Sequence, residues 1–117
     1  MKAVIRSLMS LDVDDLDGWA PASEVWALGL RVFAGPDGGP GEECFDITVC
    51  SLAWLTERVH CGGVFDGRHH LVLESYDWPM VRTYVMQRVR RCEGATWRDV
   101  AEQLARIGYW EFEDYRP

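Results

Sequence analysis

The sequence predicts a small α+β domain, in which a mainly antiparallel four-stranded sheet and three helices packed on one of its faces form a two-layer sandwich. Residues 44–50 alternate apolar and more polar side chains, which is typical of a strand with one buried face. From residue 52 onward the apolar side chains recur every three to four positions, which indicates a helix. A chain of 117 residues can bury a core without metal or disulfide staples, so we expect residues 1–117 to form a single domain.

The first strand is expected over residues 1–10, where the side chains alternate in a strand-like way. Strict alternation places Leu8 on one face together with Arg6, and places Ala3 and Ile5 on the other face. A loop follows this strand.

That loop is strongly acidic. A calcium-binding loop of the EF-hand type is excluded, because Gly18 at the turn position would make Val13 the first ligand, and no glutamate closes the loop. The loop is therefore either simply solvated or in contact with a partner. Of these two possibilities, the neighbouring Trp19 favours contact with a partner. Its carboxylates belong to Asp12, Asp14, Asp15 and Asp17.

Two further strands should form a hairpin. Residues 25–34 are almost entirely apolar, and residues 42–50 carry the alternation described above. Between them, residues 35–41 contain the glycines and prolines of a turn. A phosphate-binding loop is not expected there, because the segment joins two strands and has no lysine.

The first helix is expected over residues 52–60. Ser51 can accept a hydrogen bond from a free N–H group of the first turn. Leu52, Leu55 and Val59 fall on one stripe, which we expect to be buried against the sheet.

A fourth strand is expected from His69 to Tyr76. Adjacent side chains of a strand point to opposite faces, so His69 and His70 cannot both bind one metal without a bulge. Cys61 and Asp66 could join one of these histidines in a zinc site, but the ligand spacing typical of zinc sites is missing. We expect no metal and no other cofactor.

Two helices follow. Asp77 should cap the first of them, and Thr96 with Asp99 nearly forms a capping box at the start of the second. The apolar stripe of the first is Val81, Tyr84, Val85, Val89 and Cys92. That of the second is Trp97, Val100, Ala101, Leu104 and Ile107.

Charge limits the partners. With 12 basic and 19 acidic residues, the formal charge of −7 repels nucleic acid and anionic lipid and attracts a basic partner. Four arginines lie outside the apolar stripe of the first of these two helices, where a solvated helix face explains them. They are Arg82, Arg88, Arg90 and Arg91. We expect neither nucleic acid nor a membrane as partner.

No signal-type apolar segment follows the N-terminus, so we expect a cytoplasmic protein. The four cysteines form no Cys-x-x-Cys pair, and free thiols are the expectation. They are Cys44, Cys50, Cys61 and Cys92.

The C-terminal segment 109–117 combines aromatic and acidic residues. Trp110 and Phe112 would fall on one side of an extended segment and pin it to the core. The remaining side chains are candidates for contact with a basic partner, because aromatic anchors ringed by charge bind proteins efficiently. These candidates are Tyr109, Glu111, Glu113, Asp114 and Tyr115.

No nucleophile elbow, phosphate-binding loop or dinucleotide fingerprint is present, so we do not expect an enzyme. Two alternatives stay open. One is a generic intracellular protein-binding module. The other is a small metal-dependent hydrolase built on Asp14, Asp15, His69 or His70.

Two blocks of the sequence resemble the immunity protein 8 family. The first block is Glu42 to Cys50 followed by Trp54 and Leu55. The second runs from Cys92 through Thr96-Trp97, Leu104 and Gly108 to Trp110 through Tyr115. The resemblance implies a small cytoplasmic α+β protein, encoded beside a toxin of a bacterial polymorphic toxin system, that binds the toxin domain and protects the producing cell. The acidic loop with Trp19 and the C-terminal segment are the places where this sequence could supply such binding.

Overall fold

A computed structural model describes residues 1–112, which form one mixed five-stranded sheet and three helices. The α+β class predicted from the sequence is confirmed. The elements in chain order are β1 (Ala3–Met9), β2 (Ala27–Pro36), β3 (Glu43–Ser51), α1 (Leu52–Gly62), β4 (His70–Leu73), α2 (Trp78–Arg90), α3 (Trp97–Leu104) and β5 (Tyr109–Trp110).

The main path of the sheet runs β1-β2-β3-β4. β1 and β3 each pair antiparallel with β2, as expected for a sheet built around a hairpin. β4 instead pairs parallel with β3, because α1 and the following loop provide the crossover that a parallel pair requires. The short β5 pairs with β3 at Phe45 and Asp46, so β3 shares one of its edges between β4 and β5.

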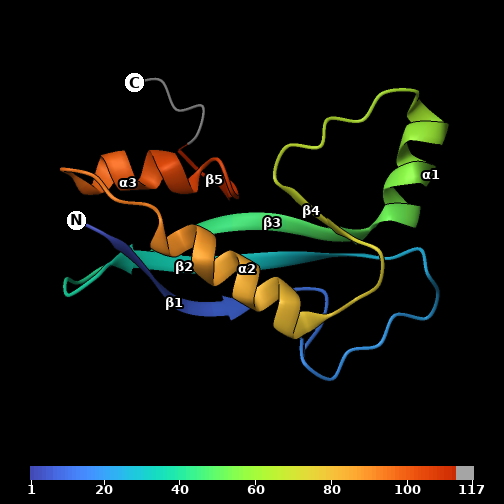
Figure 1. Ribbon diagram of the computed structural model, residues 1–117, viewed down its shortest axis with the longest axis horizontal. Coiled ribbons are helices and arrows are strands. Elements are labelled where there is room, and N and C mark those ends of the chain that lie inside the picture. The colour runs from blue at the N-terminus through green and yellow to red at the C-terminus, as the bar shows by residue number, and fades with distance from the viewer. Residues whose placement is uncertain (113–117) are drawn as a thin grey trace.

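The hydrophobic core lies between one face of the sheet and two helices. α2 lies across this face, and α3 lies beside it near the N-terminus (Figure 1). Full burial of each such aliphatic side chain contributes roughly 1.5–3 kcal/mol. The core residues of the two central strands are Leu28, Leu30, Val32, Ala34, Phe45, Ile47 and Val49, and those of the two helices are Val81, Val85, Val89, Val100, Ala101 and Leu104.

A β-bulge changes the faces of β1. The register pairs Ile5 with Ala34 and then Ser7 with Phe33, which leaves Arg6 as the additional residue. Leu8 therefore packs against the core together with Ile5. The strict alternation predicted for this strand is wrong after Ile5, because one extra residue moves every later side chain to the other face.

The predicted burial of α1 is also wrong. Ser51 accepts a hydrogen bond from the N–H of Trp54 at 3.0 Å, so the helix begins where the sequence predicts. However, α1 contains no buried residue, and Leu52 and Val59 are 56% and 42% exposed. The helix stands at the end of the sheet opposite α3, where the described chain provides no layer to cover its stripe (Figure 1).

The later elements follow the predicted patterns with small differences. Asp77 caps α2, and Thr96 and Asp99 form a complete capping box at α3. The stripe of α2 is buried except for Tyr84, which is 44% exposed. The fourth strand ends at Leu73 rather than at Tyr76.

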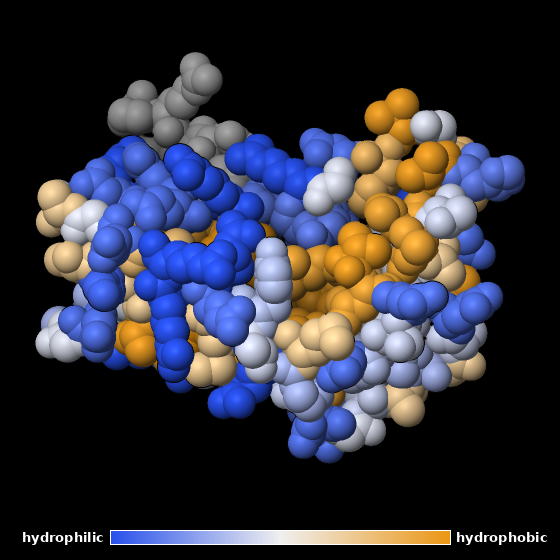
Figure 2. Space-filling model, viewed as in Figure 1, coloured by the Kyte–Doolittle hydropathy of each residue, from blue (hydrophilic) through white to orange (hydrophobic). Residues whose placement is uncertain are grey.

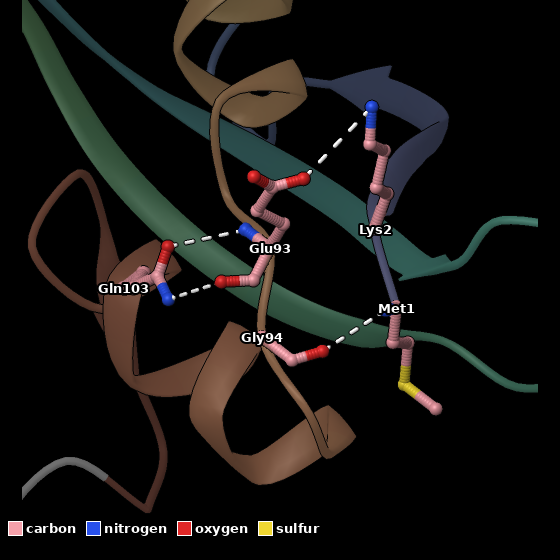
Figure 3. A network of polar contacts seen from close by, with 5 residues as sticks. All are labelled: Met1, Lys2, Glu93, Gly94 and Gln103. Atoms are coloured by element: carbon pink, nitrogen blue, oxygen red, sulfur yellow. Dashed lines mark hydrogen bonds and ion pairs between the residues drawn. The ribbon is translucent and has the colours of Figure 1, made fainter.

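The connection between α2 and α3 runs beside the N-terminus. Lys2 forms an antiparallel bridge with Glu93, and the N-terminal ammonium group donates to the carbonyl oxygen of Gly94 at 2.9 Å (Figure 3). Within residues 1–112, no helix has both the length and the hydropathy needed to cross a bilayer.

Candidate functional site

The acidic loop is shaped by its own carboxylates. The Asp12 carboxylate accepts a hydrogen bond from the N–H of Gly29 in β2 at 2.6 Å, which ties the loop to the sheet. Asp15 accepts from the N–H of Asp17 at 3.2 Å, which forms a local turn. All four aspartates of the loop are exposed, and the carboxylates of Asp14 and Asp17 accept neither of these two backbone hydrogen bonds.

Trp19 has a structural role. Its ring packs edge-on against Trp26 and Tyr76, at centroid distances of 5.9 and 4.8 Å. The hydroxyl group of Tyr76 donates to the carbonyl oxygen of Leu16, which fixes the loop above these rings. Burial, followed by the charges of Asp17 and Asp15, raises the pKa of Tyr76. The acidic loop therefore lies next to the start of α2.

The C-terminal segment divides into a buried and an exposed part. Trp110 is buried and stacks on Phe45 at 6.2 Å, so it pins the segment to β3 as the sequence predicts. Phe112, for which the sequence predicts the same role, is 43% exposed and lies against the Trp110 ring at 5.5 Å. Tyr109 is 51% exposed, and Glu111 also faces solvent. The candidates Glu113, Asp114 and Tyr115 lie outside the described residues.

One hollow brings the two predicted segments together. It lies on the face of the sheet opposite α2, has a volume of about 390 Å³, and is lined by both Asp12 and Tyr109. Between them, Arg31 donates to both carboxylate oxygens of Asp46, at 2.9 and 3.2 Å. Asp12 and Arg68 also line the hollow, so it presents charges of both signs beside an aromatic ring rather than a strong charge of one sign.

A second surface was not identified from the sequence as a binding site. We call it the apolar surface; it extends over α1, β4 and the first turns of α2 (Figure 2). The signal was present in the helical stripe of residues 52–59, but an apolar stripe alone does not reveal whether its own chain will cover it. The exposed residues of the apolar surface are Leu52, Val59, Val72, Met80 and Tyr84, with the partly buried Leu55, Leu71 and Leu73 among them.

Carboxylates border the apolar surface. Glu24, Glu57 and Glu74 line one shallow hollow together with Leu52. Asp77 lines another hollow, together with Met80. Apolar area rimmed by polar groups is the usual composition of a protein-binding surface.

The two adjacent histidines have separate structural partners. His69 adopts a positive φ of 61°, and its Nε2 donates to the carbonyl oxygen of Ala105 at 2.6 Å. The Nδ1 of His70 donates to the carbonyl oxygen of Arg68 at 2.7 Å. In the described part of the chain, no three histidine, cysteine, aspartate or glutamate side chains are grouped so that they could hold a metal ion.

Comparison with known proteins gives a match to one family over nearly the whole chain. The sequence model of a family described as Immunity protein 8 matches residues 3–115. No curated protein and no solved structure shows a significant match.

Proposed function

The chain belongs to the immunity protein 8 family, and from this membership we propose that it binds and neutralises a cognate toxin domain of a bacterial polymorphic toxin system. The match to residues 3–115 is the observation that carries the proposal. The protein would act in the cytoplasm of the producing cell, without catalysis of its own, by covering the active or substrate-binding surface of the toxin.

The charge of the chain supports this role. Toxin domains that act on nucleic acid need basic surfaces, and a formal charge of −7 attracts such a surface over several ångströms before contact. Asp14 and Asp17 are exposed on the acidic loop and are well placed to contribute to this attraction. We assign the acidic loop and the C-terminal segment to the initial encounter with the toxin.

The experiment that tests the proposal uses the toxin domain encoded beside the gene for this protein. Isothermal titration calorimetry of the two purified proteins should give a stoichiometric complex with a Kd well below micromolar. Cells that express the toxin domain should survive when they also express the protein. The absence of a complex at micromolar concentration, together with unprotected cells, would contradict the proposal.

A further inference from the structure

We propose that the apolar surface over α1, β4 and the start of α2 is the docking site for the toxin domain, and that it receives an apolar projection surrounded by basic side chains. This inference rests on the proposed function. It differs from the expectation based on the sequence, which assigned binding to the acidic loop and the C-terminal segment alone.

The first argument concerns α1. The helix has 11 residues and no buried side chain. An isolated helix of this length is marginal in water, so tertiary contacts normally stabilise it through an apolar stripe. Here the half-buried side chains of the helix are Ala53, Trp54 and Leu55, and the Trp54 ring packs against Phe65 and His70 at 5.7 and 6.1 Å. Leu52 and Val59, with the exposed part of Leu55, are left for another molecule to cover.

The second argument concerns continuity. Single exposed apolar side chains are ordinary on protein surfaces, but contiguous ones mark interaction sites. Leu71 and Leu73 of the edge strand β4 line one hollow together with Met80 and Tyr84 of α2. Figure 2 shows apolar side chains gathered over β4 and α1 as one area. This area joins three elements that are separate in sequence.

The third argument identifies the occupant by charge. Glu24, Glu57 and Glu74 border Leu52, and Asp77 borders Met80. Asp15 and Asp17 lie close enough to Tyr76, next to the start of α2, to raise its pKa. Two arginines also lie at this surface, Arg58 over the Trp54 ring at 5.6 Å and Arg88 over the Tyr84 ring at 5.9 Å, and they are outnumbered by the carboxylates. A rim of this kind favours basic groups on the partner.

The same rim argues against a second copy of this chain as the occupant. In a symmetric dimer the same surface of both subunits would meet, so the carboxylates would face one another. Like charges placed together at an interface are unfavourable. A basic toxin domain instead pairs these carboxylates with its own cations while its apolar side chains fill the centre.

The test compares two variants in their affinity for the toxin domain encoded beside the gene. In the double variant Leu52→Gln/Met80→Gln, two exposed apolar side chains become polar without a change in charge. Both positions are helical, where glutamine is well tolerated, so circular dichroism and the melting temperature should stay close to those of the wild type. Met9→Gln is the matched control, because Met9 is an exposed methionine on β1, at the edge of the sheet opposite β4.

The double variant should bind the toxin domain roughly 30-fold or more weakly, because truncation of central anchors of an interface costs about 2 kcal/mol or more. Met9→Gln should bind as the wild type does. If the wild type binds and the double variant binds equally well, the apolar surface is not the docking site, and the proposed function stands. If the wild type does not bind, the proposed function itself fails, and this inference fails with it.

Sedimentation velocity of the free protein tests the other occupant. We expect a monomer at micromolar concentration for the wild type and for the double variant. A wild-type dimer that the double variant cannot form would show that a second copy covers the surface, and would overturn the inference.

Discussion

Gln103 holds the backbone of Glu93 through both ends of its side-chain amide. Its Oε1 accepts from the N–H of Glu93 at 3.2 Å, and its Nε2 donates to the carbonyl oxygen of Glu93 at 2.7 Å (Figure 3). Glu93 also forms a bridge with Lys2. One side chain of α3 therefore connects this helix, through the segment after α2, to the first strand of the sheet.

Replacing Gln103 with methionine should lower the stability of the protein. Methionine keeps the length and helix propensity of glutamine but removes both hydrogen bonds. Each such bond contributes about 0.5–1.5 kcal/mol, so the free energy of unfolding should fall by roughly 1–2 kcal/mol. Urea denaturation monitored by circular dichroism measures this change. Gln87→Met, at an exposed position of α2, should leave the midpoint within about 0.5 kcal/mol; equal effects of the two variants would contradict the role of Gln103.

Two glycines near the β2–β3 turn form a matched pair: Gly35 lies at the end of β2, and Gly39 lies in the connection to β3. A Cβ atom on Gly35 would lie 2.1 Å from the carbonyl oxygen of Gly41, which is far closer than van der Waals contact. A Cβ atom on Gly39 would meet Pro36 at an ordinary 3.5 Å. We expect Gly35→Ala to destabilise the protein by roughly 3 kcal/mol or more, as overpacking and backbone displacement do. We expect Gly39→Ala to be nearly neutral.

Thermal denaturation of both alanine variants measures this difference. The Gly35 variant should melt roughly 10 °C below the wild type, because each kcal/mol shifts the melting temperature of a domain of this size by about 4 °C. A Gly35 variant that melts with the wild type would show that the hairpin can rearrange around the added methyl group.

Tyr76 should make the stability depend on pH in alkaline solution. Burial and the charges of Asp17 and Asp15 raise the pKa of its hydroxyl group in the folded state. The contribution of the Tyr76 hydroxyl group to the free energy of unfolding is therefore fully present below the pKa of about 10 that tyrosine has in the unfolded chain. It is lost as the pH rises through the pKa of Tyr76 in the folded state. In Tyr76→Phe this part of the pH dependence disappears.

Urea denaturation at a series of pH values from 7 to 11 compares the two proteins. Tyr76→Phe should be less stable at pH 7 by about 1 kcal/mol, because it lacks the hydrogen bond to Leu16. The difference should shrink above pH 10. The buried thiols of Cys50 and Cys92, whose pKa values burial also raises, remain in both proteins and leave a common residual slope. A constant difference across the series would contradict this role of Tyr76.

The features that the sequence predicts well depend on neighbouring residues. Ser51 and Thr96 cap their helices because a cap is decided by side chains within one turn. The alternation of Phe45, Ile47 and Val49 identifies a buried face because the pleat fixes which side chains share it. These local rules were enough for the α+β class and for most element positions.

The features that the sequence does not predict depend on residues that are distant along the chain. The bulge at Arg6 is held by its guanidinium group, which donates to the carbonyl oxygens of Pro36 and Gly39 across the sheet. Trp19 lies against Trp26 and Tyr76, so an aromatic ring beside acidic residues serves the core rather than a partner. The exposure of α1 follows from where β3 ends, and nothing within the helix reveals it. For the candidate site, the sequence predicted Asp12 and Tyr109, which line one hollow, but it did not predict the apolar surface.

Reversing the exposed charges of the acidic loop should slow the association with the toxin domain. In the variant Asp14→Lys/Asp17→Lys, two exposed carboxylates of the acidic loop become cations, which would repel a basic partner. The association rate constant should fall about tenfold at low ionic strength, and its dependence on salt should become flatter. The dissociation rate constant should change much less, because rim charges act mainly on the encounter. Stopped-flow fluorescence at several salt concentrations measures both.

The control is Asp37→Lys/Glu42→Lys, which makes the same change in net charge within the exposed β2–β3 connection. This connection lies at the end of the sheet away from the acidic loop (Figure 1). Steering by a local patch affects association more than the same charge placed elsewhere, so the control should slow binding only slightly. If both variants slow association equally, net charge alone attracts the toxin, and the acidic loop has no special position in the encounter.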